Sequence, residues 1–421
     1  MKAKFKRAEL VRELGKAEIL QDHPDGLAIA SHLLESRDSL PPRLTEKQYQ
    51  ELLSYLEYLI GRKGGGDLPG LGVVASPEAV YGSLALEKPP FPGPTNPKFK
   101  FIDLFAGIGG FRIAFQKAGG ECVFTSEWDR FAKKTYERNF GEVPFGDITA
   151  ISEEEIPKHD VLCAGFPCQP FSLAGVSKKN SLGRRHGFED ETQGTLFFDV
   201  KRIIKHHRPK AFMLENVKNL VSHDGGKTFE VIRKTLVDEL GYVVNWKIVN
   251  GGNWVPQNRE RIFIVGFDPD QVVVDREEIR IPDEPSNKYD YPELNTIIGG
   301  NVEGHTLGPG TWETLIRHKQ NHAKKGNGFG YGMHTVPIPE GGRTRTISAR
   351  YHKDGAEVLI EQPGDRPRRL TVEEGMRLQG YDHSKFVFPV SNTQAYRQIG
   401  NSVVVPAVAA CAKEIVRILQ R

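Results

Sequence analysis

Four cysteines stand at distant points of the 421-residue chain: Cys122, Cys163, Cys168 and Cys411. They are too few for a disulfide scaffold in a chain of this size, and none is part of a C-x-x-C pair, so no metal site is predicted. Each is either a buried apolar residue, which is the commoner state, or a reactive thiol. A reactive thiol would act as a nucleophile through its thiolate, even when only partly ionised.

A glycine-rich turn, Asp103-Leu-Phe-Ala-Gly-Ile-Gly-Gly110, connects an apolar segment to a helical one. Glycines at such a turn let a ligand approach the backbone closely, and the N-terminus of the helix favours negative charge. Many nucleotide-binding folds share this feature. A dinucleotide fingerprint, G-x-G-x-x-G, would need a third glycine where Arg112 stands, which argues against NAD.

Three residues further along could complete a nucleotide pocket. Glu127 ends an apolar segment twenty residues after Gly107, and a carboxylate at that place commonly accepts hydrogen bonds from ribose hydroxyls. Trp128 offers a flat face for adenine. The alternative for this pair is a solvated carboxylate beside a core tryptophan. Asp147 is predicted to reach the adenine amino group.

An acidic residue and two arginines follow at the ends of later apolar segments. Glu215, in Glu215-Asn-Val217, could be a catalytic acid or the partner of a helix N-terminus. Arg259 and Arg261 alternate in Gln257-Asn-Arg-Glu-Arg261, so on a strand both would point to the same side, toward the pocket. The alternative is that both are surface arginines beside Glu260.

Five motifs together carry a family resemblance. The turn at 103–110 is followed by Gly165-Phe-Pro-Cys-Gln-Pro-Phe-Ser172, by Glu215-Asn-Val217, by Gln257-Asn-Arg-Glu-Arg261 and by Gly400-Asn-Ser-Val-Val-Val-Pro406. In this order and spacing the chain resembles the cytosine-5 DNA methyltransferases over residues 99–267 and 395–421. The signature of that family is the Pro-Cys dipeptide at a strand end.

The resemblance implies a catalytic set of Cys168, Glu215, Arg259 and Arg261. Cys168 would be the nucleophile and add to carbon 6 of a flipped-out cytosine, because carbon 5 is otherwise too weak a nucleophile to take a methyl group. Glu215 would hydrogen-bond nitrogen 3 as the acid. One guanidinium would hold the cytosine O2, and the other the flanking backbone or the Glu215 carboxylate. The other three cysteines are expected to be structural.

The resemblance also implies S-adenosyl-L-methionine as the methyl donor, with S-adenosyl-L-homocysteine as its product. Asn401 and Ser402 would line the methionine end of this cofactor. The residues predicted to bind it are Phe105, Ala106, Gly107, Ile108, Gly109, Gly110, Glu127, Trp128, Asp147, Ile148, Pro167, Asn401 and Ser402.

Apolar segments alternate with helical ones beyond residue 96, which predicts an α/β, Rossmann-like methyltransferase fold with ligands at the carboxyl ends of its strands. The expected strands are residues 99–105, 122–126, 160–164, 211–215 and 262–267. The expected helices are 111–118, 131–139, 197–206, 227–240 and, at the end of the chain, 403–419. We predict a catalytic domain over 96–275, completed by 393–421, and a smaller, irregular target-recognition domain over 276–392.

Residues 1–95 are predicted to be an N-terminal helical extension and linker. Residues 45–60 show helical periodicity with a Thr45/Gln48 capping box, and Gly61 is expected to end this helix. The proline-rich run at 88–97 is a stiff linker. The extension could contact DNA, order the catalytic domain or bind a partner.

Contacts to DNA are expected from two regions. Residues 172–188 resemble the family's mobile loop that closes over DNA and holds the extruded base. Residues 326–333 and 343–360 resemble the Dcm-type subgroup, which implies the inner cytosine of CCWGG or a close relative as the target. Its arginines would read guanine edges or contact phosphates. The predicted DNA contacts are Gln169, Ser172, Lys178, Lys179, Arg184, Arg185, Arg343, Arg345 and Arg350.

Composition suits a soluble nucleic-acid enzyme. The chain is 38% hydrophobic and 26% charged with a net charge of +3. Eleven Lys and Arg against five Asp and Glu between positions 317 and 369 give that segment +6, as suits a partner with phosphates. No apolar run is long enough to span a membrane, and we expect a cytoplasmic protein, monomeric on double-stranded DNA, with a possible cognate restriction endonuclease.

Three other functions compete with this hypothesis. The nearest is an RNA cytosine methyltransferase with the same catalytic motifs, against which stands the long recognition region. The second is a catalytically silent DNA-binding regulator, although every chemical residue is present. The third is an NAD-dependent dehydrogenase, against which stands Arg112 at the position of the third glycine.

Overall fold

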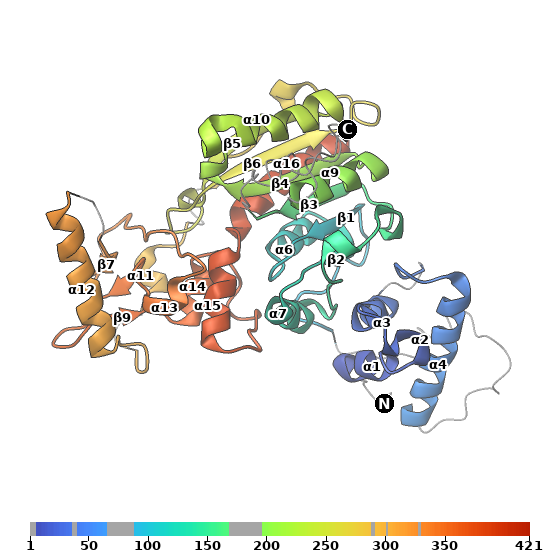
Figure 1. The fold of residues 1–421 in the computed structure, drawn as a ribbon, viewed down its shortest axis with the longest axis horizontal. Coiled ribbons are helices and arrows are strands. Elements are labelled where there is room, and N and C mark those ends of the chain that lie inside the picture. The colour runs from blue at the N-terminus through green and yellow to red at the C-terminus, as the bar shows by residue number, and fades with distance from the viewer. Residues whose placement is uncertain are drawn as a thin grey trace, which may run out of the picture.

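A six-stranded sheet forms the centre of the molecule, with the N-terminal extension on one side and the irregular region on the other (Figure 1). The computed structural model describes residues 6–35, 40–64, 88–167, 196–287, 291–299, 302–326 and 330–421. The strands are β1 (Phe99–Leu104), β2 (Gly120–Ser126), β3 (Val161–Gly165), β4 (Ala211–Val217), β5 (Val243–Asn250) and β6 (Glu260–Phe267).

The strand order is β2-β1-β3-β4-β6-β5. The first four strands are parallel, whereas β6 runs antiparallel to both β4 and β5. The five predicted strands are confirmed, but β5 was missed. The middle of this edge strand is exposed at Lys247 and Ile248, and Lys247 breaks the apolar run on which the prediction relied.

Helices cover both faces of the sheet. On one face, α6 (Gly110–Lys117) and α16 (Val405–Leu419) enclose a core that includes Phe101, Cys163 and Met213. On the other face, α9 (Leu196–His207) and α10 (Lys227–Lys234) pack against the strand residues that alternate with these and point to the opposite side of the sheet. All five predicted helices are confirmed, and the helix expected over 131–139 is α7 (Arg130–Phe140). The helix expected over 227–240 consists of α10 followed by a π-helical turn, Thr235–Glu239.

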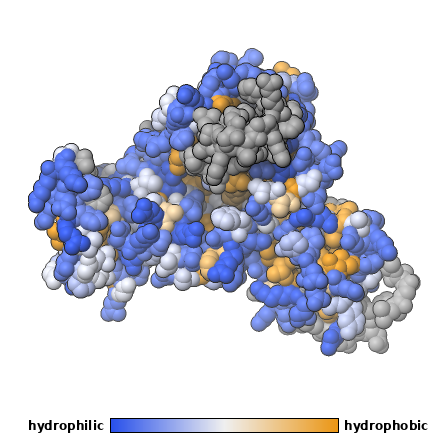
Figure 2. Space-filling view, viewed as in Figure 1, coloured by the Kyte–Doolittle hydropathy of each residue, from blue (hydrophilic) through white to orange (hydrophobic). Residues whose placement is uncertain are grey.

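The N-terminal extension consists of α1 (Arg7–Leu14), α2 (Glu18–Gln21), α3 (Gly26–Glu35) and α4 (Glu46–Gly64). The capping box is confirmed, since the Thr45 N–H donates to Gln48 at 2.9 Å and the Gln48 N–H donates to Thr45 at 3.4 Å. The predicted end at Gly61 is wrong, because α4 continues to Gly64. A single glycine costs about 1 kcal/mol in a helix, which does not by itself end one. Seen from the side drawn in Figure 2, the surface is mainly hydrophilic, with apolar residues showing over this extension.

The region after residue 290 is irregular, as predicted. It contains α11 (Leu294–Ile297), α12 (Pro309–Lys324), α13 (Tyr351–Asp354), α14 (Val372–Arg377) and α15 (Asn392–Asn401). A small sheet has the order β7 (Met333–His334), β8 (Leu359–Ile360) and β9 (Arg368–Arg369). Tyr396 and Ile399 of α15 share a buried apolar cluster with Ile108 of the glycine turn, which joins this region to the central domain.

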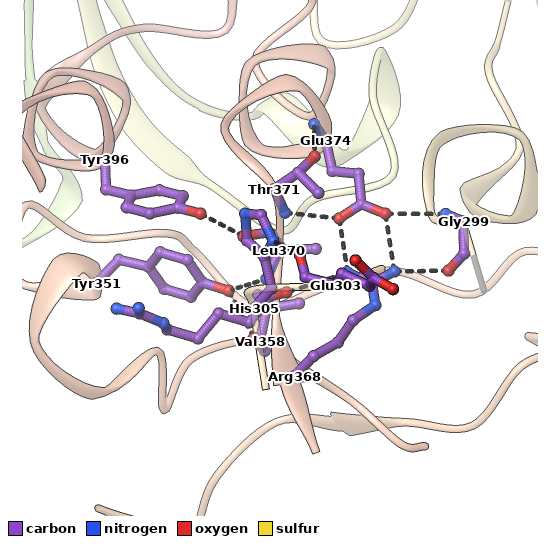
Figure 3. Close-up of polar contacts among 11 residues, drawn as sticks. Gly299, Glu303, His305, Tyr351, Val358, Arg368, Leu370, Thr371, Glu374 and Tyr396 are labelled. Atoms are coloured by element: carbon purple, nitrogen blue, oxygen red, sulfur yellow. Dashed lines mark hydrogen bonds and ion pairs between the residues drawn. The ribbon is translucent and has the colours of Figure 1, made fainter. Parts of the chain in front are cut away.

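A buried ion pair holds this region together (Figure 3). The fully buried Arg368 guanidinium pairs with both carboxylate oxygens of Glu374, at 2.9 Å each. Glu374 also accepts from the backbone N–H of Gly299 at 2.8 Å and of Thr371 at 2.7 Å. The Arg368 charge is therefore not available at the surface for a partner with phosphates. This corrects the expectation that all the basic residues of 317–369 could contact such a partner.

Replacing Glu374 by alanine is expected to lower the free energy of unfolding by about 3–5 kcal/mol, because the Arg368 charge would stay buried without a partner. Urea unfolding monitored by circular dichroism would measure the change. Glu373→Ala is the matched control: its side chain is 59% exposed and should alter the free energy by less than about 0.5 kcal/mol. Equal urea midpoints for the two variants would contradict the assignment.

Candidate active site

A cavity of about 600 Å³ opens at the carboxyl ends of the parallel strands, where the fold class predicted ligands to bind. Twelve of the thirteen predicted cofactor residues line it: Phe105, Ala106, Gly107, Ile108, Gly110, Glu127, Trp128, Asp147, Ile148, Pro167, Asn401 and Ser402. Glu215, Arg259 and Arg261 line the same cavity. Motifs from distant parts of the sequence therefore meet in one site.

Gly109 is the predicted cofactor residue that does not line the cavity. It precedes α6 with a φ of 83°, in the left-handed region that favours glycine. A Cβ at this position would lie 2.2 Å from the Phe140 ring, so a side chain cannot be accommodated. Gly109 thus shapes the turn, and its neighbours face the cavity.

Glu127 is nearly buried and binds the glycine turn directly. One carboxylate oxygen accepts the Gly107 N–H at 2.8 Å, and the other accepts the Asp129 N–H at 2.7 Å. Burial raises the pKa of Glu127, although these backbone N–H groups oppose the shift. Trp128 beside it is 78% exposed and faces the cavity, so the alternative of a core tryptophan is wrong. A flat, accessible ring at this edge suits a planar ligand.

Glu215 and Arg261 form the polar centre of the cavity. The Arg261 Nε lies 3.0 Å from the Glu215 carboxylate, and both side chains are largely buried. Burial raises the pKa of Glu215 more than Arg261 and Arg259 lower it, which favours a carboxyl group that can hold a proton. The alternative of surface arginines is wrong for both positions.

Arg259 has a different environment from Arg261. Its buried guanidinium donates to the backbone oxygens of Ile347 and Gly400 at 2.9 Å each and to that of Ser402 at 2.5 Å. Burial lowers the pKa of Arg259 to about 9, and the neighbouring Arg261 contributes to the same shift. Arg259 therefore joins the segment around 347 to the C-terminal motif, whereas Arg261 contacts the acid.

Asn216 fixes the backbone immediately before Cys168. Its side-chain amide donates to the Phe166 oxygen at 2.9 Å, and Pro167 follows on the cavity wall. Cys168 itself, with Gln169, Ser172, Lys178, Lys179, Arg184 and Arg185, lies outside the described residues. Burial raises the pKa of Cys122, Cys163 and Cys411 above the usual thiol range, which makes each of them a poor nucleophile.

Asp103 is a buried acidic residue that was not among the predicted site residues. It is fully buried in β1 just before the glycine turn, and neither carboxylate oxygen has a hydrogen-bond partner among the described residues. Burial raises its pKa to about 8, while Arg112 opposes the shift. An uncharged Asp103 is thus favoured at neutral pH, since an unpaired buried carboxylate is costly. Its position as an acidic residue within an apolar run is the sequence feature that could have identified it.

The C-terminal motif approaches the cavity together with α15. The Ser402 hydroxyl lies 2.6 Å from the Tyr381 hydroxyl, and Asn401 is exposed to the cavity. Gln394, Arg397 and Gln398 of α15 also line it, and none of them was predicted. These three lie on a helix whose sequence gives no sign of which face meets a ligand.

The three predicted recognition arginines that are described, Arg343, Arg345 and Arg350, are exposed and do not line the cavity. Their segment is joined to the active site through Thr344, which exchanges backbone hydrogen bonds of 2.9 Å with Pro256 and Asn258. The recognition segment therefore runs beside residues 256–258, immediately before Arg259 and the strand β6 that carries Arg261. An exposed guanidinium can read a base edge or contact a phosphate, so both predicted roles are open to these three arginines.

None of the helices in the described parts of the chain combines the length and the apolar character needed to cross a lipid bilayer.

Comparison with known proteins identifies the family. Residues 99–417 match the model of the C-5 cytosine-specific DNA methylases. The chain is 49% identical over 389 residues to the DNA-cytosine methyltransferase of Escherichia coli (strain K12), covering 80% of this chain and 81% of that protein. It is 44% identical over 397 residues to the type II methyltransferase M.SsoII of Shigella sonnei, covering 93% and 98%.

Solved structures share the fold at lower identity. The S. pombe Dnmt2 methyltransferase superposes with a TM-score of 0.59 at 16% identity, covering 77% of this chain and 100% of that one. This similarity supports the Rossmann-like methyltransferase fold. The family match argues against a dehydrogenase and favours DNA over RNA. The chain therefore belongs to the C-5 cytosine-specific DNA methylase family and has the DNA (cytosine-5-)-methyltransferase activity that its motifs predicted.

Proposed function

We propose that this enzyme methylates the inner cytosine of CCWGG, or of a closely related duplex sequence, through a transient covalent bond to Cys168. The observation that carries the mechanism is the meeting of Glu215 and Arg261 in one cavity with Pro167, the residue before Cys168. The resemblance of residues 326–333 and 343–360 to the Dcm-type subgroup supports the target sequence.

The proposed chemistry assigns one task to each side chain. The Cys168 thiolate adds to carbon 6 and forms a carbon–sulfur bond, while Glu215 gives a proton to nitrogen 3, so the ring stays neutral. Arg261, whose Nε lies 3.0 Å from the Glu215 carboxylate, would orient Glu215 and hold the cytosine O2. Carbon 5 then carries the electron density needed to accept an alkyl group. Loss of the carbon 5 proton to solvent, cleavage of the carbon–sulfur bond and return of the nitrogen 3 proton to Glu215 restore the aromatic ring, the thiolate and the protonated acid.

The cavity suits S-adenosyl-L-methionine, which supplies an electrophilic methyl group when it is bound. Trp128 and Ile148 would flank adenine, Asp147 would reach its amino group, and Glu127 would bind the ribose. The backbone of the glycine turn, with Asn401 and Ser402, would hold the methionine end. The fit rests on the exposed Trp128 face and on the shared cavity wall.

Trp128→Ala is expected to raise the dissociation constant for S-adenosyl-L-methionine about tenfold, since a stacked aromatic ring contributes roughly 0.5–1.5 kcal/mol beyond its buried area. Isothermal titration calorimetry would measure the change. Trp128→Phe keeps a flat face and should recover most of the affinity. Unchanged binding by the alanine variant would mean that the ring does not contact the cofactor.

The remaining assignments complete the proposal. Residues 96–275 with 393–421 form the catalytic domain, and residues 276–392 form the target-recognition domain. The whole protein acts as a monomer on double-stranded DNA. Support comes from α16, which packs beside α6 on the central sheet, and from the exposure of Arg343, Arg345 and Arg350. A cognate restriction endonuclease would act on the same sequence.

Bisulfite sequencing of plasmid DNA tests the proposal. The gene would be expressed in a host that lacks cytosine-5 methylation of its own, with a Cys168→Ala variant as the control. Methylation of the inner cytosine at CCWGG sites, absent in the control, is the expected result. Methylation confined to another sequence would refute the proposed target, and methylation of tRNA but not duplex DNA would refute the substrate class.

A further inference from the structure

The N-terminal extension shares its hydrophobic core with the catalytic domain. Ile29 and Leu33 of α3 belong to the same buried cluster as Val143 and Phe145, which follow α7 in the catalytic domain. All four side chains are at most 8% exposed. The extension therefore does not fold as a module separated from the catalytic domain by its linker, and its contacts fall next to the cofactor cavity.

The segment that the extension contacts forms one wall of that cavity. Gly146, Asp147 and Ile148 line it, immediately after the buried Phe145. On its β2 side the segment is held by two backbone hydrogen bonds of 2.9 Å, from the Phe145 N–H to Thr125 and from the Glu127 N–H to Phe145. The position of Asp147 thus depends on what fixes the backbone from residue 143 to 146.

Two side chains of the extension also bind the backbone of this segment. The Ser31 hydroxyl accepts the Val143 N–H at 2.9 Å, and the Asp25 carboxylate accepts the Gly146 N–H at 2.7 Å. Both side chains are buried. The Gly146 N–H is the backbone donor immediately before that of Asp147, so Asp25 acts one residue away from the predicted adenine contact.

Asp25 is itself held in place by Arg43. The Arg43 guanidinium lies 2.6 Å from the second carboxylate oxygen of Asp25, and its Nε lies 2.9 Å from Glu155 of the catalytic domain. Each Asp25 oxygen therefore has a partner: one the cavity wall, the other an arginine anchored across the interface. A charge-assisted hydrogen bond to a backbone N–H is among the stronger kinds in proteins.

We propose that Asp25 is a positioning residue for the cofactor, and that the N-terminal extension forms the outer support of the S-adenosyl-L-methionine site. This inference rests on the proposed function, because it requires that the wall at 146–148 contacts the adenine. It assigns the extension to cofactor binding rather than to DNA binding.

Calorimetry and steady-state kinetics on the full chain test the inference. Asp25→Ala is expected to raise the dissociation constant and the KM for S-adenosyl-L-methionine about tenfold, the effect of losing one hydrogen bond to a charged group. The kcat at saturating cofactor and the KM for duplex DNA should stay within about twofold. Asp25→Asn retains an oxygen acceptor for the Gly146 N–H and should recover most of the affinity.

Arg12→Gln is the matched control, since Arg12 pairs with Glu137 across the same interface at 3.6 Å, and neither residue lines the cofactor cavity. It should leave cofactor binding unchanged. If Asp25→Ala does not yield folded protein, Ser31→Ala is the second variant. It removes only the hydrogen bond from the Val143 N–H to an uncharged hydroxyl, and should raise the cofactor KM by about threefold.

Three results would overturn the inference. The first is wild-type cofactor affinity in the Asp25→Ala variant, or in Ser31→Ala if that is the variant that folds. The second is a loss of DNA affinity at unchanged cofactor affinity, which would assign the extension to DNA. The third is equal loss in the alanine and asparagine variants with a fall in kcat, which would indicate general destabilisation. Failure of the wild type to bind the cofactor would instead refute the proposed function.

Discussion

Cys168→Ala is expected to abolish methyl transfer, with kcat falling on the order of 10⁴-fold or more, because alanine has no thiolate to form the bond to carbon 6. Transfer of labelled methyl groups from S-adenosyl-L-methionine to duplex DNA would measure the loss. The variant should also fail to form the denaturation-resistant complex that the wild type is expected to form with DNA carrying 5-fluorocytosine. Such a complex requires a covalent adduct.

Cys122→Ala is the matched control for this experiment. The Cys122 thiol is partly buried and its pKa is raised by burial, so it cannot supply a thiolate at neutral pH. This variant should retain both methyl transfer and adduct formation. An undiminished rate in Cys168→Ala would contradict the covalent mechanism, whatever the behaviour of the control.

Glu215→Gln is expected to lower kcat by about 10²–10⁴-fold, the usual range for removing a general acid. Glutamine keeps the shape and a hydrogen bond but has no proton to transfer to nitrogen 3. Binding of DNA and cofactor should change little, so single-turnover rates are the appropriate measurement. Glu260→Gln, at an exposed neighbouring carboxylate that pairs with Lys218, is the control and should retain activity.

The raised pKa of Glu215 gives this prediction a pH dependence. Burial raises the pKa above its ordinary value of 4.5, so the protonated acid persists to higher pH than it would in water. Wild-type activity should fall as the pH rises through the folded-state pKa of Glu215, and this decline should be absent from the glutamine profile. A wild-type profile without it would contradict the role of Glu215 as the proton donor.

The same shift affects stability with a definite sign. Between 4.5 and the higher folded-state pKa, the folded protein binds more protons at Glu215 than the unfolded chain does. The contribution of Glu215 to the free energy of unfolding therefore decreases as the pH rises through this interval. Urea unfolding of Glu215→Gln should lack this part of the pH dependence.

Local features of the chain could be predicted from its residues alone. The glycine turn at 103–110, the Pro-Cys dipeptide and Glu215 are short strings whose residue types are required by their own backbone geometry or chemistry, so they could be predicted without knowing their neighbours. Four buried parallel strands and the capping box at Thr45 were likewise predictable, because continuous apolar runs and capping patterns act within a few residues.

Only the packed fold brings distant residues together. The different partners of Arg259 and Arg261, the α15 residues on the cavity wall and the support of Gly146 by Asp25 all join segments that lie far apart in the sequence. The edge strand β5 and the continuation of α4 through Gly61 also depended on packing. A sequence pattern reports which face of an element is apolar, but it does not report what that face is packed against, and in this enzyme that packing builds the site.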